Sequence, residues 1–125
     1  MVTMHNKVKS VARARSLGNE LFNSGKFSEA CLAYGEGLKQ HPVNKVLYCN
    51  RAACRFKLEQ WEKSIEDCNE ALKIHPNYTK ALLRRAASYG KVAYFDLLPF
   101  LFLFLFPDLE FWKLKSNLIY CSFGG

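Results

Sequence analysis

The chain has 125 residues, half of them hydrophobic, and carries a formal net charge of +7 with an isoelectric point near 9.3. That length suffices for one small domain, which can bury a core only if most of the chain takes part. The positive charge favours an anionic partner, whether nucleic acid, an acidic membrane face or a carboxylate-bearing peptide, and does not choose among them.

The cysteines and the N-terminal residues indicate a reducing compartment. Five cysteines form an odd set without any C-x-x-C pair, and the first residues contain no apolar signal segment. We therefore expect a cytoplasmic protein. The five are Cys31, Cys49, Cys54, Cys68 and Cys121.

Two apolar-periodic segments open the chain and predict a helix pair. The first contains "VARARSLGNELF", and the second follows a short turn at Gly25, which suits a left-handed turn conformation. We expect helices at about 5–24 and 27–40, and Pro42 ends the second because proline cannot donate a backbone hydrogen bond.

The next segment repeats the first at an offset of 34 residues. "GKFSEACLAYGEGLKQHPVN" (25–44) aligns with "EQWEKSIEDCNEALKIHPNY" (59–78), which predicts helices at about 45–58 and 61–74. Glu59 takes the place of Gly25, so we expect slight strain in the second turn. Asn44 and Asn77 follow the two prolines and can cap the helices that come next.

A fifth helix at about 79–91 begins a third copy. Small residues at Gly18, Ala52 and Ala86 hold matching places and let helices approach closely, while aromatic side chains fill the space between pairs. A 34-residue period with this alternation is typical of stacked helix-turn-helix units. The sequence resembles the tetratricopeptide repeat (TPR) family. The resemblance implies an all-α solenoid with a leader at 1–10, complete repeats at 11–44 and 45–78, and the first helix of a third repeat at 79–91.

In such a solenoid the first helix of each pair lines a concave groove and the second lies on the convex back. Most cations fall on the groove helices, where Glu20 is the single acid. The back helix of the second pair instead carries four acids. This separation of charge predicts an anionic ligand in the groove. The cations are Lys7, Lys9, Arg13, Arg15, Lys45, Arg51, Arg55, Lys57, Lys80, Arg84 and Arg85.

Five polar residues on the groove helices should converge on one spot. The segments "RSLGN", "YCNRAA" and "KALLR" resemble the two-carboxylate clamp of TPR adaptors, which hold the C-terminal Glu-Glu-Val-Asp tail of the cytosolic seventy- and ninety-kilodalton heat-shock chaperones. The family pattern is Lys-x-x-x-Asn, then Asn, then Lys-x-x-x-Arg. Arginine in place of the first lysine is the one departure, and it changes the donor geometry. The resemblance assigns peptide-carboxylate binding to Arg15, Asn19, Asn50, Lys80 and Arg84.

The chemistry of a peptide end fits these residue types. A C-terminal Asp presents two carboxylates, and each accepts charge-assisted hydrogen bonds worth roughly 1.5–3 kcal/mol when shielded from water. The asparagine amides add directed donors without adding charge. A single lysine or arginine on a helix is most often only a solvated side chain, so the prediction depends on the joint pattern.

Other candidate sites are weaker. The cysteines lie at helical spacing among apolar neighbours, which indicates small buried side chains, and His41 and His75 occupy equivalent pre-proline turns. The sequence contains no Cys/His cluster with metal spacing, no phosphate-binding glycine loop and no Ser/His/Asp set. We therefore predict no cofactor, no metal and no enzymatic activity. The lack of an RNA-module motif and of base-stacking aromatics argues against nucleic acid as the partner.

A closer resemblance covers about residues 11–91, through "GNELFNSGKFSEACLAYGEGL", "LYCNRAACRFKLEQWEKSIEDCNEAL" and "YTKALLRRAAS". These segments resemble the plant TPR-containing thioredoxin-like proteins, which implies a scaffold role in stress or hormone responses. The thioredoxin part is missing, and without a C-x-x-C pair no dithiol chemistry carries over. The alternative to a chaperone-binding adaptor is thus a truncated fragment with no independent activity.

The repeat pattern stops after Lys91, and residues 92–125 form a Phe/Leu-rich tail. Its apolar run from Leu97 to Phe106 contains Pro99 and is shorter than the ~20 residues that a membrane-spanning helix needs. It could enter a membrane interface or cover the third groove helix. A further hypothesis is translation of a retained intron, because Lys-Val can be encoded by AAG-GTN, which contains a splice donor. A groove truncated in this way would lack the partner helix that holds Lys80 and Arg84 in place.

Overall fold

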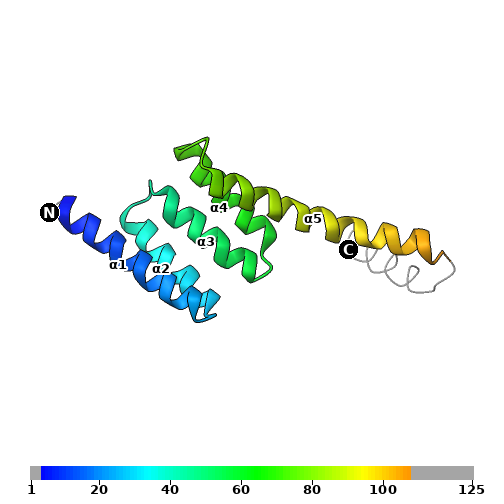
Figure 1. Cartoon of the computed structure of the whole chain (residues 1–125), viewed down its shortest axis with the longest axis horizontal. Coiled ribbons are helices and arrows are strands. Elements are labelled where there is room, and N and C mark those ends of the chain that lie inside the picture. Colours follow the sequence, from blue (N-terminus) through cyan, green and yellow to red (C-terminus); the bar gives the residue numbers. More distant parts are fainter. Residues whose placement is uncertain (1–3, 108–125) are drawn as a thin grey trace, which may run out of the picture. The chain divides into compact units, whose positions relative to one another are not determined.

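The computed structural model describes residues 4–107, and within this range every regular element is an α-helix. The first four helices begin and end within one residue of their expected positions, and the all-α prediction is confirmed (Figure 1). The helices are α1 (Met4–Asn23), α2 (Phe27–Gln40), α3 (Lys45–Lys57), α4 (Trp61–Ile74) and α5 (Thr79–Leu105).

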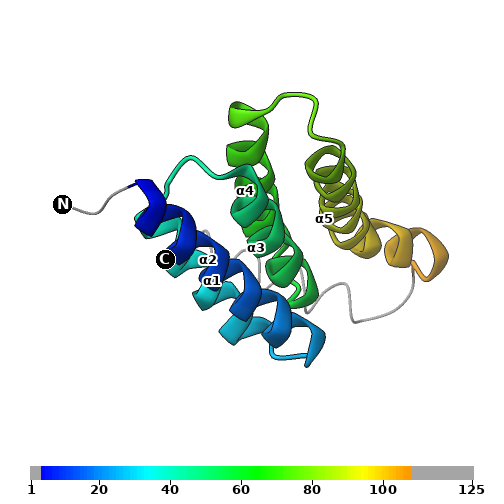
Figure 2. The same ribbon diagram turned by 60° about the vertical axis from the view of Figure 1, so that its left-hand side comes forward.

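Helices α1 and α2 form one antiparallel pair, and α3 and α4 form the next (Figures 1 and 2). The turns within the pairs place Gly25 at φ 78° and Glu59 at φ 61°, so the predicted strain at the second turn is confirmed. Each turn carries an edge-to-face aromatic contact. The ring centroids of Phe22 and Phe27 lie 5.1 Å apart, and those of Phe56 and Trp61 lie 4.9 Å apart. The 34-residue repeat is therefore also a repeat in space.

The core consists of two clusters that share helix α3. One joins α2 to α3 through Ala30, Tyr34, Leu38, Leu47 and Cys54, with partly buried side chains of α1 packed against it. The other joins α3, α4 and α5 through Cys49, Ala71, Leu72 and Ala81. Asn44 caps α3, since its Oδ1 accepts a hydrogen bond from the Leu47 amide at 3.0 Å.

Buried hydroxyls attach the first half of α5 to the second repeat. The Ser88 hydroxyl donates to Ser64 Oγ at 3.0 Å, and the Ser64 hydroxyl donates to the Ala52 carbonyl oxygen at 3.0 Å. Both serine side chains are fully buried, so each needs such a partner. These bonds hold α5 in the place of a third groove helix.

Helix α5 does not end at about residue 91 as expected. It continues to Leu105 with Pro99 inside it, so the prediction of an irregular tail is wrong for residues 92–105. Between Lys91 and residue 107 no turn and second helix follow, and Ala86, which should have packed against that second helix, is exposed. The part of the predicted tail from 108 to 125 lies outside the described residues.

The chain divides into two compact units between Val92 and Ala93. In the second unit, the described side chains from Tyr94 to Phe106 are mostly exposed and apolar; Phe100 is 63% and Phe104 is 84% exposed. Helix α5 is, by length and composition alone, long and apolar enough to cross a membrane, with 6% of its most apolar stretch buried. The apolar run from Leu97 to Phe106 was expected to be too short for a membrane-spanning helix. This expectation is corrected, because most of the run belongs to the longer helix α5.

Candidate functional site

Three of the five predicted site residues line one pocket. Asn19 of α1, Asn50 of α3 and Arg84 of α5 surround a cavity of about 150 Å³, together with Phe22, Tyr34 and Ala53. The structure thus brings together one predicted residue from each of the three helices at the groove. A neighbouring cavity of about 230 Å³ shares Phe22, Ala53 and Arg84 and is otherwise lined by Phe56, Lys57 and Ala87.

Arg84 is held in place by the backbone and side chain of Cys49. Its Nη1 donates to the Cys49 carbonyl oxygen at 2.8 Å and lies 2.9 Å from Cys49 Sγ. Both contacts use the same nitrogen, so Nη2 and Nε keep their donors for other acceptors. The guanidinium is half-buried and makes no ion pair with any acid within residues 4–107. Arg84 is an anchored cation that still offers donors to a ligand.

Arg15 and Lys80, the other two predicted site residues, each act electrostatically on a partly or fully buried side chain near the start of α3 or α5. Burial raises the pKa of the Cys49 thiol, and the positive charges of Arg84 and Lys80 act in the opposite direction. Burial likewise raises the pKa of Tyr78, and Arg84 and Arg15 oppose that shift. Arg84 thus acts on both groups, whereas Lys80 acts on Cys49 and Arg15 on Tyr78.

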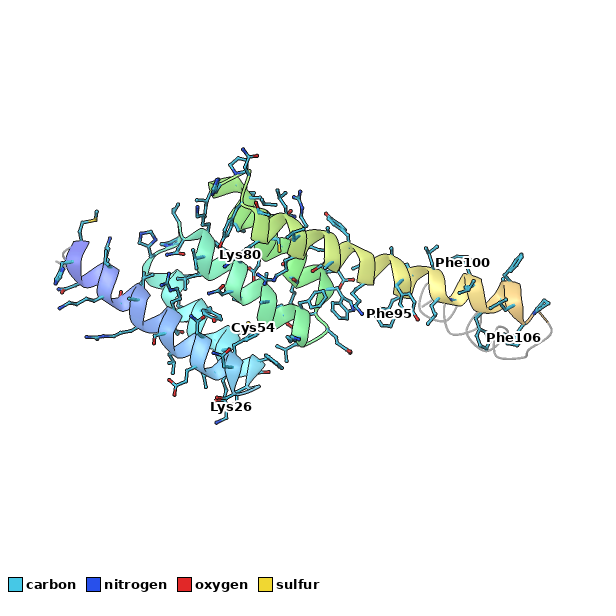
Figure 3. The ribbon with its side chains drawn as sticks, in the orientation of Figure 1. Lys26, Cys54, Lys80, Phe95, Phe100 and Phe106 are labelled. Carbon is cyan, nitrogen blue, oxygen red and sulfur yellow. The ribbon has the colours of Figure 1, made fainter. Side chains whose placement is uncertain are left out.

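The charges of Arg15 and Lys80 are not neutralised inside the described part of the chain. Both side chains are exposed, and neither makes a hydrogen bond or ion pair with another residue between 4 and 107. Lys80 stands on the first turn of α5 (Figure 3). The half-buried Asn50 amide also has no hydrogen-bond partner within that range. The site consequently combines unpaired cations with unpaired amide donors, which suits a carboxylate ligand.

Three arginines outside the predicted site bond to the back helix α4. Arg51 binds the buried Asp67 of α4 with two hydrogen bonds of 2.9 and 2.7 Å, and Arg55 lies 2.9 Å from the same carboxylate. Arg85 donates to Asn69 of α4 at 2.9 Å. One step along a helix turns a side chain by about 100°, so these residues point to the back helix while Asn50 and Arg84 line the pocket.

The sequence did not identify the side chains that support the pocket. Tyr34 donates a hydrogen bond of 2.5 Å to Asn19 Oδ1, and Cys49 accepts from Arg84. No His/Cys/Asp/Glu group suitable for a metal occurs among residues 4–107. Cys49, Cys54 and Cys68 are buried, as expected for structural cysteines, and Cys31 is half-buried.

Part of the sequence matches a known repeat family. A sequence model of the tetratricopeptide repeat matches residues 46–78, which comprise α3, α4 and the turn that follows. The chain carries a TPR. It is 68% identical over 84 residues to the inactive TPR repeat-containing thioredoxin TTL3 of Arabidopsis thaliana; the match covers 67% of this chain and 12% of that protein. The chain thus spans about an eighth of the length of this relative.

Solved TPR domains have the same fold. The TPR2AB domain of yeast Sti1, in its complex with pHSP90, superposes with a TM-score of 0.66 at 34% identity, over 67% of this chain and 33% of that chain. The second TPR of Spaghetti (RPAP3), bound to the HSP90 peptide SRMEEVD, superposes with a TM-score of 0.68 at 28% identity, over 71% of this chain and 82% of that chain. The present chain therefore has the all-α fold of these TPR domains.

Proposed function

We propose that this chain is a non-enzymatic adaptor module that binds the acidic C-terminal tail of the seventy- and ninety-kilodalton heat-shock chaperones in its TPR groove. The main observation in support of this function is that Asn19, Asn50 and Arg84, from three different helices, line one pocket. Arg15 and Lys80 are the remaining members of the site. The two TPR structures described above, each in complex with an HSP90 ligand, support this class of partner.

In this proposal each group has a separate task. Lys80 and Arg15 supply exposed cations that attract the carboxylates, and Arg84 supplies Nη2 and Nε from a fixed position. Asn19 and Asn50 donate amide hydrogens to the terminal residue and its peptide unit. The apolar cavity lined by Phe22, Phe56 and Ala87 adjoins the charged pocket, so the same groove can also take an apolar side chain of the peptide.

Calorimetric titration with the peptide Met-Glu-Glu-Val-Asp tests the proposal, using its free-acid and C-amidated forms. The wild-type chain should prefer the free acid. Lys80→Ala, which removes an exposed cation without a structural contact, and Arg84→Ala should each weaken free-acid binding roughly tenfold or more, since a charged hydrogen bond contributes about 1.5–3 kcal/mol.

Arg85→Ala is the matched control, because Arg85 is the next residue of the same helix and bonds to Asn69 on α4. It should leave peptide affinity unchanged. Equal affinity of the wild type for both peptides, or equal losses in Lys80→Ala and Arg85→Ala, would contradict the proposal. Circular dichroism melts of the Arg84 variant separate lost binding from lost folding, since Arg84 also contacts the Cys49 carbonyl.

A second candidate function follows from the length of the match to TTL3. The chain spans 12% of that protein. In this alternative it is a truncated fragment of a TPR-thioredoxin scaffold and has no independent activity. Sequencing of transcripts across the codons for Lys91 and Val92 tests this. A message that continues from Lys91 into further repeats would favour the fragment, and a message that encodes residues 92–125 as spliced exon would oppose it.

A further inference from the structure

The Asn19 side chain makes its only hydrogen bond within the described residues to a buried tyrosine of the neighbouring helix. The Tyr34 hydroxyl lies 2.5 Å from Asn19 Oδ1, and the Tyr34 residue is 2% exposed. A buried tyrosine hydroxyl needs a partner, and the amide oxygen is the acceptor available to it. The hydroxyl remains a donor at any physiological pH, since burial, with a smaller effect of Cys54, raises the pKa of Tyr34 to about 12.

The direction of this bond fixes which end of the amide faces the pocket. An asparagine side chain carries an acceptor oxygen on one side and two N–H donors on the other, and a flip of the amide exchanges them. With Oδ1 occupied by the tyrosine, Nδ2 is the group left for the pocket that both residues line. A carboxylate ligand accepts hydrogen bonds only, so this orientation favours it.

The second repeat supplies an internal comparison. Asn19 and Tyr34 correspond, 34 residues later, to Ala53 and Cys68, so neither the amide nor the hydroxyl is present there. The preceding position changes with them, from Gly18 to Ala52. A Cβ at Gly18 would overlap the Tyr34 ring, so only glycine lets the tyrosine reach across to Asn19. Gly18, Asn19 and Tyr34 thus occur together in the first repeat, whose asparagine lines the pocket, and are all replaced in the second.

We propose that Tyr34 is a positioning residue of the TPR groove, which orients the Asn19 amide so that its N–H donors face the pocket and select a peptide carboxylate over a neutral peptide end. This inference rests on the proposed function. It adds Tyr34, which is not one of the five residues that the clamp pattern assigns to carboxylate binding. Gly18 is the second part of the device, because it makes room for the ring.

Tyr34→Phe in the full chain is the decisive variant, since it keeps the ring against Gly18 and removes only the hydroxyl. The released amide can flip and present its oxygen to the ligand. We expect free-acid affinity for Met-Glu-Glu-Val-Asp to fall roughly two- to tenfold. Affinity for the C-amidated peptide should stay the same or rise, so the ratio of the two affinities falls. Tyr89→Phe, at an exposed tyrosine of α5, is the matched control and should change neither.

The background variant Asn19→Ala shows whether Tyr34 acts through Asn19. In that background Tyr34→Phe should have no further effect on either peptide. An equal loss with and without Asn19, or an unchanged acid-to-amide ratio in Tyr34→Phe, overturns the positioning role while the proposed function stands. If the wild type binds neither peptide, the proposed function is wrong and the positioning role falls with it.

A side-chain measurement adds a readout that a purely structural tyrosine would not move. The Asn19 Nδ2 protons should be assignable by NMR, with nuclear Overhauser contacts to Asn50 or Arg84 of the pocket in the wild type. In Tyr34→Phe these Nδ2 contacts should weaken, while the contacts between the phenylalanine ring at position 34 and Gly18 should persist. Nδ2 contacts in the wild type that are stronger to the Tyr34 ring than to Asn50 and Arg84 would show the opposite amide orientation and overturn the inference.

Discussion

At the scale of single residues, burial sets the reactivity of the thiols. Burial raises the pKa of Cys54 to about 12 and that of Cys68 to about 11, and it raises the pKa of Cys49 as well. A raised pKa means less thiolate at a given pH, and the thiolate is the form that reacts. At pH 8 a thiol with a pKa of about 11 is ionised in roughly one molecule in a thousand.

We therefore predict that iodoacetamide at pH 8 modifies Cys31, which is half-buried, well before Cys49, Cys54 and Cys68. Timed labelling followed by mass spectrometry of the tryptic peptides measures this order. Raising the pH by one unit should speed the reaction of the three buried thiols by up to tenfold, and urea should remove the differences. Labelling of Cys68 as fast as that of Cys31 in the native chain would contradict the burial.

Residue-scale features also mark the limit of what the sequence could predict. The repeat phase identified Asn19, Asn50 and Arg84, because residues one period or one turn apart fall on the same face. The phase did not reveal that Arg51 and Arg55 serve the buried Asp67, since that depends on which way a long side chain turns within its reach. The Tyr34 bond to Asn19 was hidden for the same reason.

At the scale of elements, the two turns within the repeats are a natural pair for comparison. Both Gly25 and Glu59 have positive φ, which costs a non-glycine residue about 1–2 kcal/mol. We predict that Glu59→Gly stabilises the chain by roughly 0.5–1 kcal/mol, because the relief of strain exceeds the added entropy of the unfolded chain. Gly25→Ala should destabilise it by about 1 kcal/mol. Urea denaturation measures both changes.

Opposite signs for the two substitutions are essential to this prediction. A Glu59→Gly variant that is less stable than the wild type would mean that the Glu59 side chain contributes more to stability than its backbone conformation costs.

The helices themselves were predictable because a 34-residue repeat fixes four boundaries at once. The end of α5 was not, because Pro99 indicates a break, yet the helix continues past it to Leu105 without the backbone hydrogen bond that proline cannot donate.

At the scale of the whole molecule, every buried residue between positions 4 and 107 belongs to the first compact unit. The core and the buried polar side chains end at Ser88, and the unit ends at Val92. The described residues after that point are largely exposed leucines and phenylalanines, which water disfavours and which favour association. The five proposed site residues, from Arg15 to Arg84, also lie before the boundary.

We predict that a variant ending at Val92 melts within a few degrees of the full chain and remains monomeric, whereas the full chain self-associates. Circular dichroism melts and sedimentation velocity at matched concentrations measure the two properties. The double substitution Leu97→Lys and Phe104→Lys in the full chain is the control of constant length, since both side chains are exposed. It should reduce association as the truncation does. A truncated chain that unfolds far below the full chain would instead mean that residues after Val92 contribute to the fold, and free-acid peptide affinity would then fall with stability.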